Sequence, residues 1–566
     1  MGATSGQNDL WVFREGHNIV SGPHLIEELR SKVREVMGTQ AAPSGLLNTL
    51  IRAGQIEAAL SDAGSPSAGT VSRLTDALAQ TLYGKSDNLA QVALNLNVSV
   101  PEKLTICTPE GFSYYALHPI DFGRLALRVG TNGHPAAVLG IRSIGTTLSA
   151  VVSAALSTTG IPVERLTVRP TGHPYDRVIH FTLEEQKWID KQELMGASFL
   201  IVDEGPGRSG STFLSVAEAL LQAGVPKERI TLLGSRQPDL TQLCSPNGSN
   251  RWSQFQFAAV VPDSHSRFQD FTYIGGGEWR RNALELSGEW PTCWPQMERL
   301  KFLSPDGRRF WKFEGMGSFG EQVQLCTHEL TKSGFGIPSA DEGGGFVSYP
   351  LIHGNRMRAQ DISNSLLENI ARYCAFRSAE FRMPPNIPDR LAEMLVHNVQ
   401  QEFGLELDTA VDDLITGNVL LTDGRMQPHE WITDAGGRLL KTDACAHGND
   451  HFFPGPCDIA WDIAGVAVEW DLSPDALQRL LSFYRQLTGD DTSKRLPVFI
   501  LAYNVFRLGW CRMAMSSVAG TPDEFGIHRA YAEYRERAEM EILILQRDLR
   551  HGKMKDSFVA KAERSV

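Results

Sequence analysis

The sequence predicts an α/β protein with two large domains, and three observations lead to this prediction. Its 566 residues exceed what one hydrophobic core normally supports. From about residue 100 to 275, short apolar runs suited to buried strands alternate with helical patterns, which is typical of a parallel sheet covered by helices. Helical spacing also marks much of residues 1–100 and the end of the chain, at Pro474–Leu487, Val498–Met515 and Glu524–Arg550.

The composition describes a soluble globular protein, with 42% hydrophobic and 21% charged residues. A net charge of -12 argues against a general nucleic-acid-binding surface. No segment reads as a membrane span, the N-terminus lacks a signal region, and eight cysteines are scattered without a C-x-x-C pair. We therefore expect a cytoplasmic protein with no membrane or nucleic-acid partner, whose first 100 residues form a cap or a homodimer surface.

The most informative stretch is Phe199–Thr212. Four apolar residues suited to a buried strand run into Asp203 and Glu204, and a small-residue loop then opens into an amphipathic helix at Phe213. Backbone amides at such a helix start can seat a phosphate, while the two acids can accept hydrogen bonds from vicinal hydroxyls. The loop residues expected to seat the phosphate are Gly205, Gly207, Arg208, Ser209, Gly210, Ser211 and Thr212.

This stretch resembles the phosphoribosyl-diphosphate (PRPP) motif of type I phosphoribosyltransferases. The resemblance implies that Asp203 and Glu204 are the catalytic acids, which bind the ribose hydroxyls directly or through Mg²⁺. One departure is that four residues, Gly205 to Arg208, separate the acids from Ser209, where three are expected. No Gly-Lys-Ser/Thr follows, so the loop is not a P-loop. The alternative is an ordinary turn between a strand and a helix, with an acid pair on the surface.

A second small-residue turn follows the apolar run Ala136–Ile141 and precedes a helix from Leu148. It is similar to the pyrophosphate loop of the same family, and the resemblance places Arg142, Ser143 and Gly145 at the diphosphate. A simple helix-capping turn is the alternative. The polar segment Val168–Arg177 lies between the two motifs, where the family has a flexible active-site loop, although a plain solvent loop fits its composition equally well.

The second half contains a weaker set of signals. Lys312 lies in the strand-like run Phe310–Glu314, a helix follows from Glu321 to Lys332, and Asp443 follows another short strand. In this order the residues distantly resemble the aminoglycoside phosphotransferase and choline kinase group of the protein-kinase-like fold. The resemblance implies that Lys312 binds nucleotide phosphates, that Glu329 or Glu321 orients it, and that Asp443 and Glu430 hold a metal.

The departure in this half is serious. Arg425 stands where the group has its catalytic Asp, and Glu430 stands where the group has a metal-binding Asn. The sequence therefore leaves open an active kinase, a pseudokinase or nucleotide-binding module, and an unrelated helical domain. A polar cluster at His447, Asp450 and His451 suits either a transition-metal site or a solvated turn.

The predicted architecture is a helical cap over 1–100, a phosphoribosyltransferase-like domain over 101–275 and an α+β kinase-like domain with a helical C-terminal lobe over 296–566. The expected function is Mg²⁺-dependent phosphoribosyl transfer between PRPP and a nucleobase-like small molecule, in either direction, coupled to a domain that uses ATP to phosphorylate a small molecule. The alternative is a regulatory protein that senses PRPP or a nucleotide without turnover.

Overall fold

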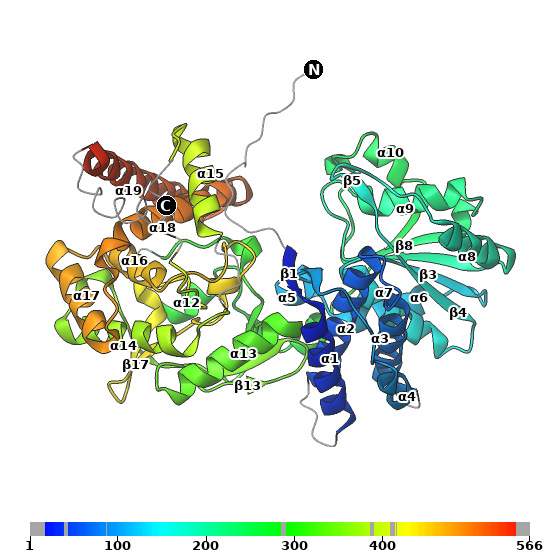
Figure 1. Cartoon of the computed structure of the whole chain (residues 1–566), viewed down its shortest axis with the longest axis horizontal. Helices are drawn as coiled ribbons and strands as arrows, with labels where there is room; N and C mark the ends of the chain where they lie inside the picture. The colour runs from blue at the N-terminus through cyan, green and yellow to red at the C-terminus, as the bar shows by residue number, and fades with distance from the viewer. Residues whose placement is uncertain are drawn as a thin grey trace, which may run out of the picture.

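The computed structural model describes residues 17–38, 44–85, 88–284, 290–384, 390–407, 414 and 416–550. Within them the chain forms a mixed α/β structure with a parallel sheet in its first half and a mainly helical C-terminal region (Figure 1). This confirms the predicted α/β class at that level. No helix in the described segments is both long enough and apolar enough to cross a membrane.

The first half is organised around a five-stranded parallel sheet of order β4-β3-β7-β8-β9. Its strands are β3 (Ala136–Ile141), β4 (Val163–Val168), β7 (Ser198–Val202), β8 (Ile230–Gly234) and β9 (Gln256–Ala259). The order is 2-1-3-4-5 in chain sequence, which places the topological switch point between β3 and β7.

Alternate residues of these strands pack on opposite faces of the sheet, as the period of two requires. Val138, Leu200 and Val202 pack with helices α6 (Pro119–Val129) and α7 (Ile144–Ser157). Leu139 and Ile201 pack with α8 (Leu183–Leu194) and α9 (Ser211–Gln222) on the other face. Strands buried on both faces explain why this region reads as continuous apolar runs.

The described part of the N-terminal region adds four helices and one strand. Helices α2 (Gly45–Asp62) and α3 (Ala68–Leu82) pack on α7, while α1 (Gly22–Met37) packs on α2 and α4 (Leu89–Leu94) packs on α3. Strand β1 (His17–Ser21) pairs with β2 (Lys103–Cys107). A Cβ on Gly54 of α2 would lie 2.1 Å from the hydroxyl of Thr147, so α2 and α7 approach too closely for any other residue there. The predicted helical cap is therefore a layer on the parallel-sheet domain.

The second half begins with a five-stranded antiparallel sheet of order β10-β11-β12-β14-β13. Its strands are β10 (Thr272–Tyr273), β11 (Lys301–Leu303), β12 (Arg309–Phe313), β13 (Ala340–Asp341) and β14 (Phe346–Pro350), and α13 (Gly317–Lys332) connects β12 to β13. Because β10 pairs with β11, the last residues of the predicted first domain contribute to this second sheet.

A three-stranded antiparallel sheet and a helical region complete the chain. The sheet comprises β15 (Gly354–Arg356), β16 (Trp431–Asp434) and β17 (Leu439–Lys441). The helices are α14 (Asn364–Glu380), α15 (Leu391–Phe403), α16 (Ala460–Glu469), α17 (Pro474–Thr488), α18 (Leu496–Val518) and α19 (Glu524–Arg550). The last three match the helices predicted from the sequence, and they form the core of this region with α14 and α16.

One hydrophobic cluster contains residues from both halves of the chain. Phe313 and Phe346 of the antiparallel sheet pack in the same cluster as Leu233 and Val202 of the parallel sheet. Between the halves, α13 lies against the N-terminal layer, since the Gly317 amide donates to the Asn48 side chain at 2.9 Å (Figure 1).

Candidate functional site

The Asp203–Glu204 pair lies at the carboxyl end of β7, beside the turn that leaves β3. Gly140 pairs with Val202, so the two loops leave adjacent strands within two residues of each other. A Cβ on Gly145 would lie 2.6 Å from the Val202 carbonyl oxygen, which shows how closely the turns pack. Both predicted loops thus meet at the switch point of the sheet, where ligands bind in open α/β folds.

The acid pair is held in a desolvated environment. Burial raises the pKa of Asp203 to about 6, although the Glu204 amide, Arg169 and Arg177 act in the opposite direction. Burial, with Asp203 and Glu110 as negative neighbours, raises the pKa of Glu204 to about 8. Near pH 7 Glu204 therefore carries a proton for most of the time, and a cation or a hydroxyl donor would favour its ionised form.

The predicted phosphate loop ends at the start of α9. Gly210, the N-cap residue, has φ +64°, and a Cβ there would lie 2.9 Å from the Trp252 ring, so glycine is required. Gly210 has no side chain that could cap α9, but the Ser209 hydroxyl accepts a hydrogen bond from the Ser211 amide at 3.3 Å, so a phosphate bound at this helix start would replace that hydroxyl. Gly207 and Arg208 are exposed at the rim of this loop.

A short hairpin lies against this loop. It consists of β5 (Thr171–His173) and β6 (Asp176–Val178), where the sequence predicted an irregular loop. The Pro174 carbonyl oxygen accepts hydrogen bonds from the hydroxyls of Ser209, at 3.0 Å, and Ser211, at 2.7 Å. These hydroxyls would have to leave Pro174 in order to bind a phosphate.

The second predicted loop carries a strained residue. Ser143 has φ +105° directly before α7, a conformation that L-residues rarely adopt and that concentrates at functional sites. Arg142 donates to the Thr167 carbonyl oxygen at 3.0 Å and pairs with Asp62 at 3.3 Å, and Arg169 pairs with the same carboxylate. In this structure Asp62 of α2 therefore pairs with Arg142, which the sequence analysis placed at the diphosphate, and with Arg169 of the segment between the two motifs.

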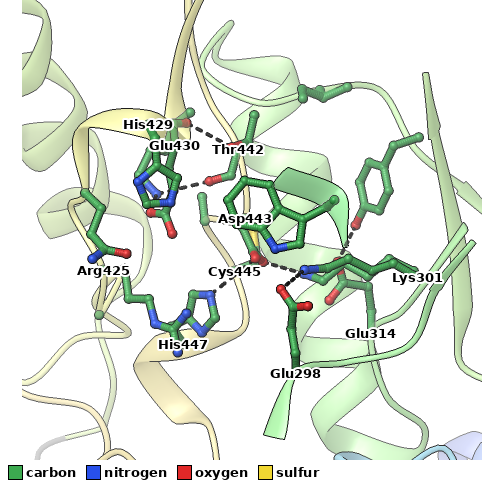
Figure 2. A pocket seen from close by; sticks show the side chains of 18 of the residues that line it. Glu298, Lys301, Glu314, Arg425, His429, Glu430, Thr442, Asp443, Cys445 and His447 are labelled. Carbon is green, nitrogen blue, oxygen red and sulfur yellow. Dashed lines mark hydrogen bonds and ion pairs between the residues drawn. The ribbon is translucent and has the colours of Figure 1, made fainter. Parts of the chain in front are cut away.

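The second half contains a cavity of about 230 Å³ between the antiparallel sheet and the three-stranded sheet (Figure 2). Lys312 of β12 is buried in its wall, and its Nζ lies 3.0 Å from Glu314 and in direct contact with Asp443. Burial would lower the pKa of Lys312, but Asp443 and Glu314 raise it, so the lysine stays charged. A buried lysine aimed into a cavity is the arrangement that a phosphate-binding lysine needs.

The structure does not bring Glu329 to Lys312, which corrects the sequence prediction. The carboxylate of Glu329 lies 3.8 Å from Lys332, and that of Glu321 lies 2.6 Å from Lys32 of α1. Glu314 takes the expected position instead, because it lies two residues beyond Lys312 on the same face of the chain.

Asp443 lies on the cavity wall, two residues beyond the end of β17. Its φ of +54° turns the chain sharply, and its carboxylate also lies 3.4 Å from His447. Burial would raise the pKa of Asp443, but Lys312 and His447 hold it well below its usual range, so it remains an anionic ligand. Glu430 lines the same cavity, but its carboxylate forms an ion pair with the Lys441 ammonium group, with 2.8 Å between Nζ and Oε2.

These carboxylates suit magnesium only in part. Mg²⁺ is usually held by one or two carboxylates together with water and substrate phosphates, so Asp443 fits and Glu430 fits only if it leaves Lys441. Across the described residues, no three His, Cys, Asp or Glu side chains form a ready-made metal cluster. The structure thus gives no transition-metal site at His447 and Asp450.

The remaining cavity wall is aromatic and basic. Trp279, from the short helix α12 (Trp279–Ala283), stacks on His429 with 5.6 Å between ring centroids. Burial lowers the pKa of His429 to about 3, helped by nearby cations, so this ring is neutral. Arg425 lies with its guanidinium 5.9 Å from the Trp510 ring centroid.

Comparison with known proteins gives little further direction. No model of a known family and no curated protein matches the sequence. Among solved structures, the chain is similar to choline kinase LicA from Streptococcus pneumoniae (12% identity, 42% of this chain, 89% of that chain, TM-score 0.31). It is also similar to a choline/ethanolamine kinase family protein from Mesorhizobium loti (14%, 43%, 85%, 0.30) and a putative aminoglycoside phosphotransferase from Ralstonia eutropha (14%, 46%, 94%, 0.30). Likenesses this low assign no function, so the proposals below rest on the residues.

Three functional neighbours escaped the sequence analysis: Asp62, Glu314 and Lys441. Glu314 could have been found from its i, i+2 spacing with Lys312 in a strand. Lys441 carries a weaker signal, as a charged residue in an otherwise apolar strand. Asp62 carries no such signal, because its contacts with Arg142 and Arg169 join residues that are 80 and 107 positions apart in the sequence and depend on how α2 packs.

Proposed function

We propose that the parallel-sheet domain binds PRPP with Mg²⁺ and transfers its phosphoribosyl group to a nitrogen of a nucleobase-like acceptor. One observation carries this proposal: the acid pair, the glycine-capped start of α9 and the strained Ser143 turn all meet at the switch point of the sheet. A ribose phosphate with a diphosphate on its anomeric carbon presents the vicinal hydroxyls and the two phosphate groups that such a site would bind.

Each part of the site has a role in this reaction. Residues 205–212 and the first turn of α9 would seat the 5-phosphate, and Asp203 and Glu204 would hold the ribose hydroxyls. The turn at Arg142, Ser143 and Gly145 would face the diphosphate. When bound by the acid pair and the diphosphate, Mg²⁺ would supply positive charge for the leaving group. The fixed carboxylates would stabilise the cationic character that develops on the ribose.

The experiment is to incubate the full chain with PRPP, Mg²⁺ and a panel of nucleobases, and to measure the release of diphosphate. Release that depends on one base, and that is lost in Asp203→Asn/Glu204→Gln, supports the transferase. Saturable PRPP binding without release under any base favours the alternative, a PRPP sensor without turnover.

For the second domain we infer binding of a nucleoside triphosphate in the cavity at Lys312. The observation in favour is the buried Lys312 between Glu314 and the anionic Asp443 on the wall of that cavity. Lys312 would contact the phosphates, and Asp443 would hold a magnesium ion that neutralises them. Titration of the chain with a non-hydrolysable ATP analogue tests this proposal, with Lys312→Met expected to weaken binding and the exposed Lys332→Met as the matched control.

A further inference from the structure

Arg425 differs in its ion pairing from Lys301, Lys312, Lys441 and Arg507, which line the same cavity. Lys301 pairs with Glu298 at 2.8 Å, Lys441 pairs with Glu430 at 2.8 Å, and Arg507 pairs with Glu469 at 3.3 Å. Lys312 has two carboxylate partners. Within the described part of the chain, Arg425 makes no ion pair, and its guanidinium lies over the face of Trp510.

A cavity arginine held by an aromatic ring and by no carboxylate favours an anionic ligand. Guanidinium groups bind phosphate with paired, directed hydrogen bonds, and stacking on a ring orients the plane without using the N–H donors. Arg425 lines the same cavity as Asp443 and His447, and Lys312 also lines it, so an anion bound at Arg425 would share the cavity with the proposed phosphate site (Figure 2).

Two carboxylates near Arg425, those of Asp423 and Asp450, are poorly suited to take the proton of an alcohol. Asp423 lies two residues before Arg425, but it is fully buried and bonded to Tyr373 and Lys441. Burial would raise the pKa of Asp450, yet His447, with Arg299 and Arg425, lowers it to about 2, which makes it a weak proton acceptor. An alcohol needs help to lose its proton, whereas a phosphate monoester is largely a dianion at neutral pH.

We propose that Arg425 forms the acceptor subsite of the second domain and that the acceptor is a phosphate monoester. This inference rests on the proposed nucleotide binding at Lys312. In the reaction, an acceptor phosphate oxygen forms a bond to the γ-phosphorus of the nucleoside triphosphate, and the bond from that phosphorus to the β–γ bridging oxygen breaks. The nucleoside diphosphate leaves with that electron pair, and no proton is taken from the dianionic acceptor. Arg425 offsets the repulsion between the two anions.

The test measures binding on the full chain saturated with Mg²⁺ and a non-hydrolysable ATP analogue. The probes are inorganic phosphate, ribose 5-phosphate and uridine monophosphate, with ribose and uridine as neutral counterparts. We expect Arg425→Gln to bind one anion fewer per chain than the wild type, by equilibrium dialysis, or to bind it about 10- to 100-fold more weakly. Arg425→Lys should retain part of the affinity, and Arg372→Gln, which changes an exposed arginine of α14, should change nothing.

The outcomes separate the two proposals. If the ATP analogue itself does not bind, the nucleotide proposal fails, and the acceptor proposal fails with it. If the analogue binds but all three anions bind Arg425→Gln as they bind the wild type, only the acceptor proposal is overturned. Binding of the neutral counterparts as strongly as the phosphates overturns it as well. Transfer of label from γ-labelled ATP to a phosphate monoester, with loss in Arg425→Gln, would support the reaction.

Discussion

Replacing Glu204 with Gln should make the protein more stable while it abolishes PRPP binding. The half-buried carboxyl of Glu204 lies beside the negative charges of Asp203 and Glu110, and partial burial with these neighbours raises its pKa from 4.5 to about 8. Glutamine keeps the shape and removes the charge. A group that binds ligand in a desolvated, like-charged setting destabilises the free protein whenever it ionises.

The sign follows from the protons bound in each state. Between pH 4.5 and 8 the native protein keeps the Glu204 proton that the unfolded chain releases, so the wild type loses stability as the pH rises through this window. A shift of the Glu204 pKa from 4.5 to 8 lowers the free energy of unfolding of the wild type by about 3 kcal/mol at pH 7. Because solvent partly reaches this side chain and screens its charge, we expect the free energy of unfolding of Glu204→Gln to exceed that of the wild type by about 2 kcal/mol.

Thermal unfolding of the wild type and Glu204→Gln at pH 5 and pH 8 measures this effect. The variant should melt roughly 4 to 8 °C higher at pH 8 and within about 2 °C of the wild type at pH 5. Asp176→Asn, at an exposed position of β6, is a matched control with no expected pH-dependent gain. A melting difference that is the same at both pH values, or a variant less stable at pH 8, would refute the reasoning.

Three further predictions concern the two sites. PRPP with Mg²⁺ should bind more tightly as the pH rises from 6 to 8, because ionised Asp203 and Glu204 bind the cation. Calorimetry in two buffers of different ionisation enthalpy should detect the protons released on binding. Binding that weakens over this pH range would count against the assignment of the acid pair. Asp62→Asn should strengthen the binding of inorganic diphosphate by about 10-fold, because the substitution removes the ion pairs of Arg142 and Arg169. An unchanged affinity would show that these arginines do not contact the ligand. Lys312→Met should lower the affinity for the ATP analogue by about 10- to 100-fold, whereas Lys332→Met should leave it unchanged in the same titration. An equal loss of affinity in both variants would exclude a specific contact between Lys312 and the phosphates.

The sequence predicted the architecture well where local patterns decide it. The strand runs ending at Ile141 and Val202 and the three C-terminal helices appear near their predicted bounds, because apolar spacing over these lengths leaves few alternatives. The order of the parallel sheet could not be read from any one segment. It follows from which strands pair across long connections, and it is what places the two loops side by side.

The sites were predicted less completely than the fold. The acid pair and the loop after it were identifiable because neighbouring residues carry the whole pattern. By contrast, the partner of Lys312 was assigned to the wrong element, since helix positions such as Glu329 were preferred over the strand neighbour Glu314. Long-range pairs such as Asp62 with Arg142 depend on tertiary packing and leave no trace in the local sequence.

The most direct test of the central claim is calorimetric titration of the full chain with PRPP and Mg²⁺, on the wild type and on Asp203→Asn/Glu204→Gln. The account predicts saturable binding of one PRPP per chain in the wild type and none in a double variant that is folded and melts no lower. Equal binding by both proteins, or no binding by the wild type at any pH between 6 and 8, would contradict it.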